Sequence, residues 1–141
     1  MKKIVLILFY IISLYAQYEW SEPVELSVTG VYPDTRYELP AITVDNNGTL
    51  YAFWIKDIAY EFLTWYSQIE YRKSTDGGLT WSTTENLTPE YNFYRIIEIQ
   101  AVCDSQNNVH LFYLRGNSPY KVLYKKFNGD SWSEPNEISP Y

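Results

Sequence analysis

Three side chains in this 141-residue sequence have the types and spacing to bind a ligand: Arg36, Glu38 and Arg95. Arg36 and Glu38 are two residues apart, so a strand would present them on the same face. Arg95 stands at the corresponding place in a second, similar stretch of sequence. Guanidinium and carboxylate groups form directional hydrogen bonds, which together with aromatic rings suit sugar ligands. We therefore predict that Arg36, Glu38 and Arg95 bind a ligand.

The single cysteine and the single histidine offer less chemistry. One cysteine, Cys103, excludes an intrachain disulfide. It lies in an apolar stretch, where a free cysteine usually packs as a small hydrophobic residue. His110 is seven residues further on and has no partners with the spacing of zinc ligands. We predict neither a metal site nor a cofactor.

Repeated segments indicate which elements position these residues. The repeats share a Trp-Ser strand, an apolar strand leading through an Asn/Gly turn into an aromatic strand, and a Tyr-basic strand. The Trp-Ser segments are WSEPVELS (20–27), WSTTENLT (81–88) and WSEPNEIS (132–139). The apolar and aromatic strands with their turn are AITVDNNGTLYAFW (41–54) and QAVCDSQNNVHLFY (100–113). The Tyr-basic strands are IEYRKS (69–74) and VLYKKF (122–127). Four strands that recur every 50–60 residues or so are typical of β-propeller blades rather than of a solenoid.

The blade order predicts where the candidate residues gather. In a four-stranded blade, the connectors between blades and the loops after the second strand lie on one side. Here the connectors are residues 28–39 and 88–97, and the loops are residues 56–65 and 115–120. Arg36, Glu38 and Arg95 therefore belong to this side, as does any carboxylate in the first loop.

The segment from Ser74 to Trp81, STDGGLTW, carries a family resemblance. It resembles the Asp box, S-x-D-x-G-x-T-W, of the bacterial neuraminidase repeat in sialidase-like β-propellers. Asp accepts backbone N–H bonds within such a turn, Gly supplies positive φ and Trp packs against the turn. The resemblance implies a structural role, away from the active face, for Ser74, Asp76, Gly78, Thr80 and Trp81. A second copy at 127–132 keeps only its tryptophan.

The resemblance also implies an active-site pattern, from which this sequence departs. The arginine that holds the sialic acid carboxylate in sialidases falls on Glu38, and an anion there would repel that carboxylate. Arg36 or Arg95 could compensate. Asp57 is a weak candidate for the family's acid/base, although a solvated loop carboxylate is the favoured interpretation. Glycoside hydrolysis generally needs two flanking groups, and the second cannot be assigned here.

The fold expected is all-β: two blades of a sialidase-like, roughly six-bladed propeller. Residues 20–27 would form an extra N-terminal strand, and the blades would cover 37–88 and 94–139. Two blades cannot close a propeller, so further blades must come from a longer chain, which we favour, or from other copies. The aromatic content of 18% agrees with strands.

Residues 1–16 resemble a secretory signal peptide, because Lys2 and Lys3 precede the apolar run from Ile4 to Leu14. The alternative is an N-terminal membrane anchor, but the run is short for a membrane span. The mature chain, 17–141, would be exported and contain no membrane span. It would have nine basic and seventeen acidic side chains, which disfavours nucleic acid as a partner.

Three functions are therefore compatible with the sequence. The favoured one is a non-catalytic module that binds a carbohydrate or another cell-surface ligand. The second is the N-terminal fragment of an exo-α-sialidase, and the third is a structural or adhesion scaffold. The lost arginine at position 38 favours the first function over the second.

Overall fold

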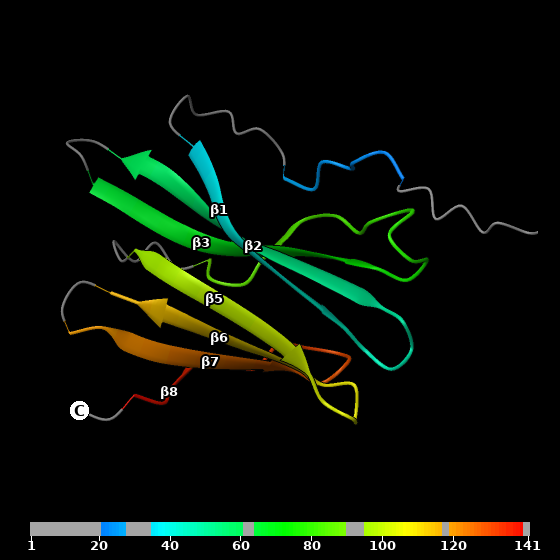
Figure 1. Cartoon of the computed structure of the whole chain (residues 1–141). Helices are drawn as coiled ribbons and strands as arrows, with labels where there is room; N and C mark the ends of the chain where they lie inside the picture. Colours follow the sequence, from blue (N-terminus) through cyan, green and yellow to red (C-terminus); the bar gives the residue numbers. More distant parts are fainter. Residues whose placement is uncertain (1–20, 28–34, 61–63, 90–94, 117–118, 140–141) are drawn as a thin grey trace, which may run out of the picture.

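Two four-stranded antiparallel sheets make up the protein in the computed structural model, which describes residues 21–27, 35–60, 64–89, 95–116 and 119–139 (Figure 1). The first sheet has the order β1-β2-β3-β4, and the second has the order β5-β6-β7-β8. The predicted all-β fold with two four-stranded blades is confirmed. The predicted signal peptide, 1–16, lies outside the described residues. Among the residues that are described, no helix has the length and hydropathy that crossing a membrane requires.

The first sheet contains β1 (Thr35–Val44), β2 (Leu50–Tyr60), β3 (Thr64–Ser74) and β4 (Glu85–Asn86). A tight turn joins β1 to β2. Its Asp45 carboxylate accepts the amide hydrogens of Asn47, at 2.9 Å, and of Thr49, at 2.8 Å. Gly48 in this turn has a φ of 83°, a conformation that glycine adopts without steric cost.

The second sheet contains β5 (Ile96–Cys103), β6 (Val109–Arg115), β7 (Lys121–Phe127) and β8 (Asn136–Glu137). Asp104 repeats the role of Asp45, because its carboxylate accepts the amides of Gln106 and Asn108 at 2.8 and 2.9 Å. The two turns touch each other: the Asn46 amide donates to the Asn107 side chain at 2.9 Å. The sequence repeat is thus a repeat of turn geometry as well.

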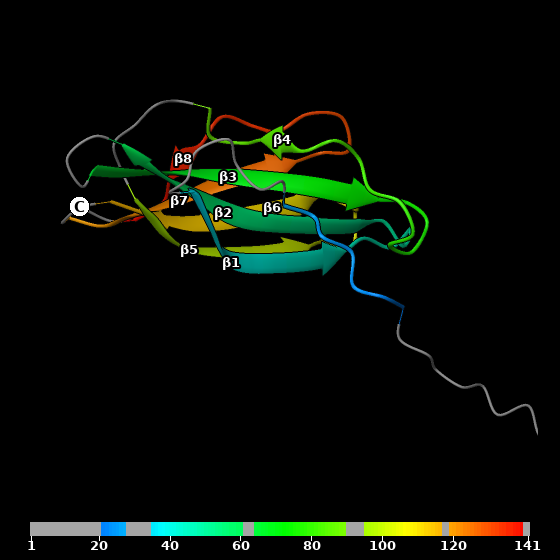
Figure 2. The same cartoon turned by 90° about the horizontal axis from the view of Figure 1, so that it is seen from above.

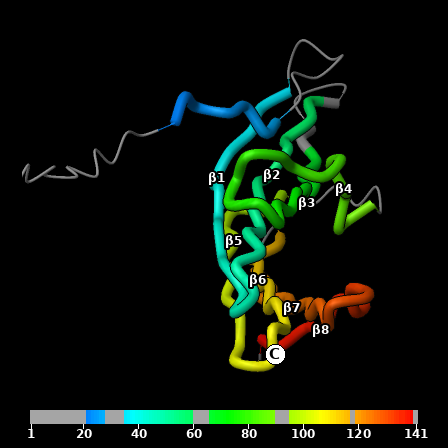
Figure 3. Tube along the Cα trace, turned by 90° about the vertical axis from the view of Figure 1, so that its right-hand side faces the viewer, coloured from blue at the N-terminus to red at the C-terminus, as the bar shows by residue number. Residues whose placement is uncertain are grey.

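The two sheets pack face to face, with β1 and β5 at one edge and β4 and β8 at the opposite edge (Figures 2 and 3). Phe53 and Tyr71 of the first sheet stack at a centroid distance of 5.6 Å. Trp132, which follows β7, meets both rings edge-on at 5.9 and 5.6 Å. The aromatic side chains of Phe53, Tyr71 and Trp132 therefore contribute to the core between the sheets.

The turn after β3 ties its own residues together. The Ser74 hydroxyl donates to Asp76 at 2.8 Å and accepts the Gly78 amide at 2.9 Å. Asp76 accepts both the amide and the hydroxyl of Thr80, at 2.9 and 2.5 Å. The Trp81 indole N–H donates to the Gly78 carbonyl at 3.0 Å. These bonds lower the pKa of Asp76 to about 2, since hydrogen bonds to a carboxylate favour its charged form.

One expectation about an individual segment differs from the structure, and the extra N-terminal strand stays a prediction. The predicted loop 56–65 is too long, because β2 continues to Tyr60 and β3 begins at Thr64. Residues 21–27 of the predicted N-terminal strand pair with no sheet among the described residues, and Trp20 is not described. They run across the outer face of the first sheet (Figures 1 and 2). A strand needs a neighbour for its backbone hydrogen bonds, and this segment has none among the residues described.

Candidate functional site

The candidate site lies where β2 ends, at the edge between the two sheets. Tyr51, Phe53 and Ile55 alternate along β2 with their side chains buried between the sheets. Asp57 occupies the next position in this row and is only 2% exposed. The expectation of a solvated loop carboxylate is therefore wrong, because the period-two alternation of the strand carries this side chain inward.

Two strand neighbours flank Asp57. Arg36 of β1 and Ser67 of β3 are its cross-strand partners in the register of the sheet. The Ser67 hydroxyl donates to the Asp57 carboxylate at 2.5 Å and accepts the Ile96 amide of the second sheet at 2.9 Å. Ser67 thus connects the buried carboxylate to the first residue of β5.

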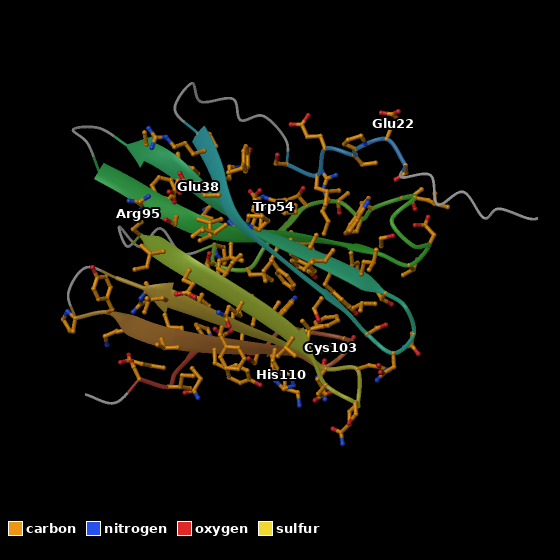
Figure 4. The ribbon with its side chains drawn as sticks, in the orientation of Figure 1. Glu22, Glu38, Trp54, Arg95, Cys103 and His110 are labelled. Carbon is orange, nitrogen blue, oxygen red and sulfur yellow. The ribbon has the colours of Figure 1, made fainter. Side chains whose placement is uncertain are left out.

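Arg95, which directly precedes β5 of the second sheet, lies close to two carboxylates of the first sheet. Its guanidinium lies 3.7 Å from Asp57 and 3.7 Å from Glu38, and half of its side chain is exposed. Figure 4 shows Glu38 and Arg95 at neighbouring positions across the gap between the sheets. The structure therefore brings Glu38, Asp57 and Arg95 into one cluster, with Arg36 close enough to act on the charge of Asp57.

Opposing effects determine the protonation of Asp57. Burial raises its pKa, because desolvation disfavours the charged form. The Ser67 hydrogen bond and the charge of Arg95 act in the opposite direction, and Glu38 adds to the increase. The net result is a pKa above the usual range for aspartate, which is a common property of groups in functional sites.

Irregular backbone accompanies the cluster on both sheets. The pairing of β1 with β2 shifts register between Glu38 and Ala41, and Leu39 within this bulge has a φ of 50°. A register shift also occurs near the start of β5, between Ile96 and Glu98. Bulges reorient side chains and are common beside functional sites, and a non-glycine residue at positive φ stores strain.

A cavity of about 250 Å³ adjoins the cluster, because Ser67 contributes to its lining. Arg115, Lys125 and Glu134 contribute charged groups to its lining, and Tyr113 contributes an aromatic ring. The Lys125 ammonium is nearly buried and donates to the Leu87 carbonyl of the first sheet at 2.8 Å. The cavity lining thus offers hydrogen-bond donors and acceptors, which suits a polar ligand, and it shares Ser67 with the cluster.

The other sequence candidates lie elsewhere. Ser74 pairs with Leu50 at the opposite end of β2, so the Ser74–Trp81 turn lies roughly 23 Å from Asp57 along the strand. Cys103 and His110 are also at that end (Figure 4). Burial raises the pKa of the Cys103 thiol, and His110 bonds to Asp104 and Tyr124 at 3.0 and 2.7 Å. No group of metal-ligating side chains is present among the described residues.

Ser67 is the member of the cluster that the sequence reasoning missed. The alternation of YSQIEY, residues 66–71, places Ser67 on the same face as the buried Ile69 and Tyr71. A small hydroxyl residue in an inward-facing position of a strand must find a partner. That signal, combined with the pairing of β2 and β3, would have identified both Ser67 and the burial of Asp57.

The sequence matches no family model and no curated protein. Among solved structures, the chain resembles one described as Hadza microbial sialidase Hz136, with a TM-score of 0.58 and 16% identity. The match covers 72% of this chain and 26% of the sialidase, so the chain spans about a quarter of that protein's length. At this identity the likeness shows a sialidase-like β-propeller fold and nothing about activity.

Proposed function

We propose that this chain is part of an exported sialidase-like propeller that binds a glycan without hydrolysing sialosides. The observation that carries the proposal is the cluster in which Arg95 lies 3.7 Å from both Glu38 and Asp57. A sialic acid carboxylate would have to displace two protein carboxylates from this guanidinium. Sugar hydroxyls, by contrast, can donate to the carboxylates and accept from the arginine.

The adjoining cavity supports a small sugar unit as the ligand. Its volume of about 250 Å³ is below the range of roughly 300–1,000 Å³ typical of drug-sized ligands. Sugar hydroxyls near Arg115 and Glu134 would use the charged lining without requiring a net charge on the ligand. We infer a neutral terminal sugar as the preferred class.

Arg95→Ala is expected to weaken glycan binding by at least about 10-fold, because a hydrogen bond to a charged group contributes about 1.5–3 kcal/mol. Binding would be measured by calorimetry with a glycan first found on an array. Arg72→Ala is the matched control, because Arg72 bonds to Thr84 and is not part of the cluster. Equal affinities of the two variants would contradict the site. If a folded sample binds no glycan on the array, the scaffold function is favoured instead.

A second function, the N-terminal fragment of an exo-α-sialidase, is favoured by one observation. A buried aspartate with a raised pKa is suited to act as a general acid. A fluorogenic sialoside assay on the complete gene product separates the two functions. Turnover that the Asp57→Asn substitution abolishes would contradict the binding-only function. Absence of turnover in a protein that binds glycans would support it.

A further inference from the structure

Asp57 and Glu38 share the single positive charge of the Arg95 guanidinium. Asp57 is 2% exposed and approaches the guanidinium from the interior, at 3.7 Å. Glu38 lies at the same distance of 3.7 Å, with 36% of its side chain exposed, and 52% of the Arg95 side chain is exposed. A ligand from solvent can therefore displace Glu38 from the guanidinium, but not the buried Asp57.

The charged groups around Asp57 come from both sheets. On β1, Arg36 is its cross-strand partner and Glu38 stands two residues further along the strand. Arg95 directly precedes β5, and Arg115 of β6 lines the cavity beside the cluster. The charges of Arg95 and Arg36 favour the ionised form of Asp57, whereas the charge of Glu38 favours the neutral form. Ionisation of Asp57 changes the net charge of this cluster by one unit.

Burial and the hydroxyl of Ser67 are the uncharged influences on Asp57. Ser67 of β3 donates a hydrogen bond to the carboxylate, which lowers the pKa of Asp57. Burial has the larger effect and raises this pKa, because desolvation disfavours the charged form. The pKa of Asp57 in the folded protein therefore lies above the value of about 3.9 for an aspartate in an unfolded chain. As pH falls, Asp57 loses its charge at a higher pH than an ordinary aspartate does.

We propose that Asp57 determines the charge specificity of the site: ionised, it restricts the site to neutral sugars, and neutralised, it lets Arg95 bind a sulfated or carboxylated sugar. The inference rests on the proposed function, because it names the ligand class that the same site takes at each pH. A ligand anion that displaces Glu38 still shares Arg95 with Asp57 while Asp57 is charged. Once Asp57 is protonated, the ligand anion has the guanidinium to itself.

The pH dependence of this specificity has a defined sign. Protonation of Asp57 removes a negative charge beside the ligand anion, so affinity for the anion rises as pH falls through the folded pKa of Asp57. Linkage requires the reverse effect as well: a bound anion raises the pKa of Asp57. A neutral sugar has no such coupling through charge.

Titration with inorganic sulfate tests the proposal, because sulfate stays anionic at both pH 4 and pH 7. NMR spectra of the full chain report sulfate binding through the Arg95 side-chain N–H and protonation through the carboxyl carbon of Asp57. A Glu38→Gln background leaves Asp57 as the titrating carboxylate beside Arg95. In this background we expect sulfate affinity to rise at least about 10-fold from pH 7 to pH 4, the size expected for unit charges several Å apart near a protein surface.

Asp57→Asn in the same background mimics the neutral aspartate. This double variant should bind sulfate at pH 7 at least about 10-fold more tightly than Glu38→Gln alone, and it should lose most of the pH dependence. Asp130→Asn is the matched control for overall charge. Asp130 is exposed in the turn after β7, at the end of the second sheet that holds Cys103, so its loss should leave sulfate affinity unchanged.

Two results of the sulfate titrations would overturn the proposal. The first is a folded double variant that binds sulfate no more tightly at pH 7 than Glu38→Gln does. The second is a sulfate affinity of Glu38→Gln that changes at a different pH from the protonation of Asp57. The second result needs no variant of Asp57, so it decides the question even if Asp57→Asn does not fold.

A glycan array probed at pH 7 and pH 4 gives the functional result. We expect neutral sugars to bind at pH 7 and sulfated or carboxylated sugars to bind at pH 4, and the array distinguishes these two anionic classes. Neutral sugars alone at both pH values would overturn the assigned ligand class. An array without any bound glycan would contradict the proposed function, whereas the sulfate titrations do not depend on glycan binding.

Discussion

Replacing Phe53 by alanine is expected to lower the free energy of unfolding by about 3–5 kcal/mol, the range measured for buried phenylalanines. Phe53 is 1% exposed and lies at the centre of the contact between the sheets. Its ring stacks on Tyr71 and meets Trp132 edge-on, so the substitution removes contacts within one sheet and between the two. A typical domain has only about 5–15 kcal/mol of stability.

Urea unfolding of dilute protein measures this loss. Phe112→Ala is the matched control, because Phe112 is the counterpart of Phe53 in the second repeat but is only partly buried and lies outside the core between the sheets. The control should cost about 1 kcal/mol or less in the monomer, as expected for substitutions away from a packed core. Equal losses in the two variants would contradict the central place of Phe53 in the contact between the sheets.

Much of the fold follows from local patterns in the sequence. The Asn/Gly turns, the alternation of each strand and the recurring Trp-Ser segments predict two four-stranded sheets, because each signal depends only on neighbouring residues. The repeat also predicts the shared turn geometry of Asp45 and Asp104. Residues 21–27 show the limit of such reasoning. The repeat predicts a strand there, and this stays a prediction because no segment among the described residues pairs with residues 21–27.

The candidate site was predictable only in part. Strand ends and loops predict that Glu38 and Arg95 lie on one side of the molecule, and the structure joins them at 3.7 Å. The contributions of Asp57 and Ser67 depend on the pairing register of β2 with β3 and on the packing of β5. Those are contacts between residues distant in sequence, and a one-residue change in the register of β2 with β3 would have turned one of the two side chains outward.

Ser67→Ala is expected to lower the free energy of unfolding by about 3 kcal/mol at neutral pH. The Ser67 hydroxyl satisfies two groups at once, as donor to the Asp57 carboxylate and as acceptor for the Ile96 amide. Its removal leaves a nearly buried carboxylate without its closest donor and a buried N–H without an acceptor.

The pH dependence distinguishes these two contributions. The pKa of Asp57 is raised in the folded protein, so this group favours folding most below its unfolded pKa of about 3.9. That stabilisation is lost as pH rises through the folded pKa, where the carboxylate ionises in its buried position. Ser67→Ala raises the folded pKa further, because the Ser67 hydrogen bond lowers it. The cost of the substitution should therefore shrink from pH 7 toward pH 4.

Asp57→Asn supplies the control for this mechanism, because asparagine fills a similar volume and does not ionise. In the Asp57→Asn background, Ser67→Ala should cost the same at pH 4 and pH 7, about 1–3 kcal/mol for the unsatisfied Ile96 amide. Urea unfolding of the wild type, Ser67→Ala, Asp57→Asn and the double variant at pH 4 and pH 7 measures each of these costs. A pH-dependent cost that persists without the aspartate would show that another group, and not Asp57, is coupled to Ser67.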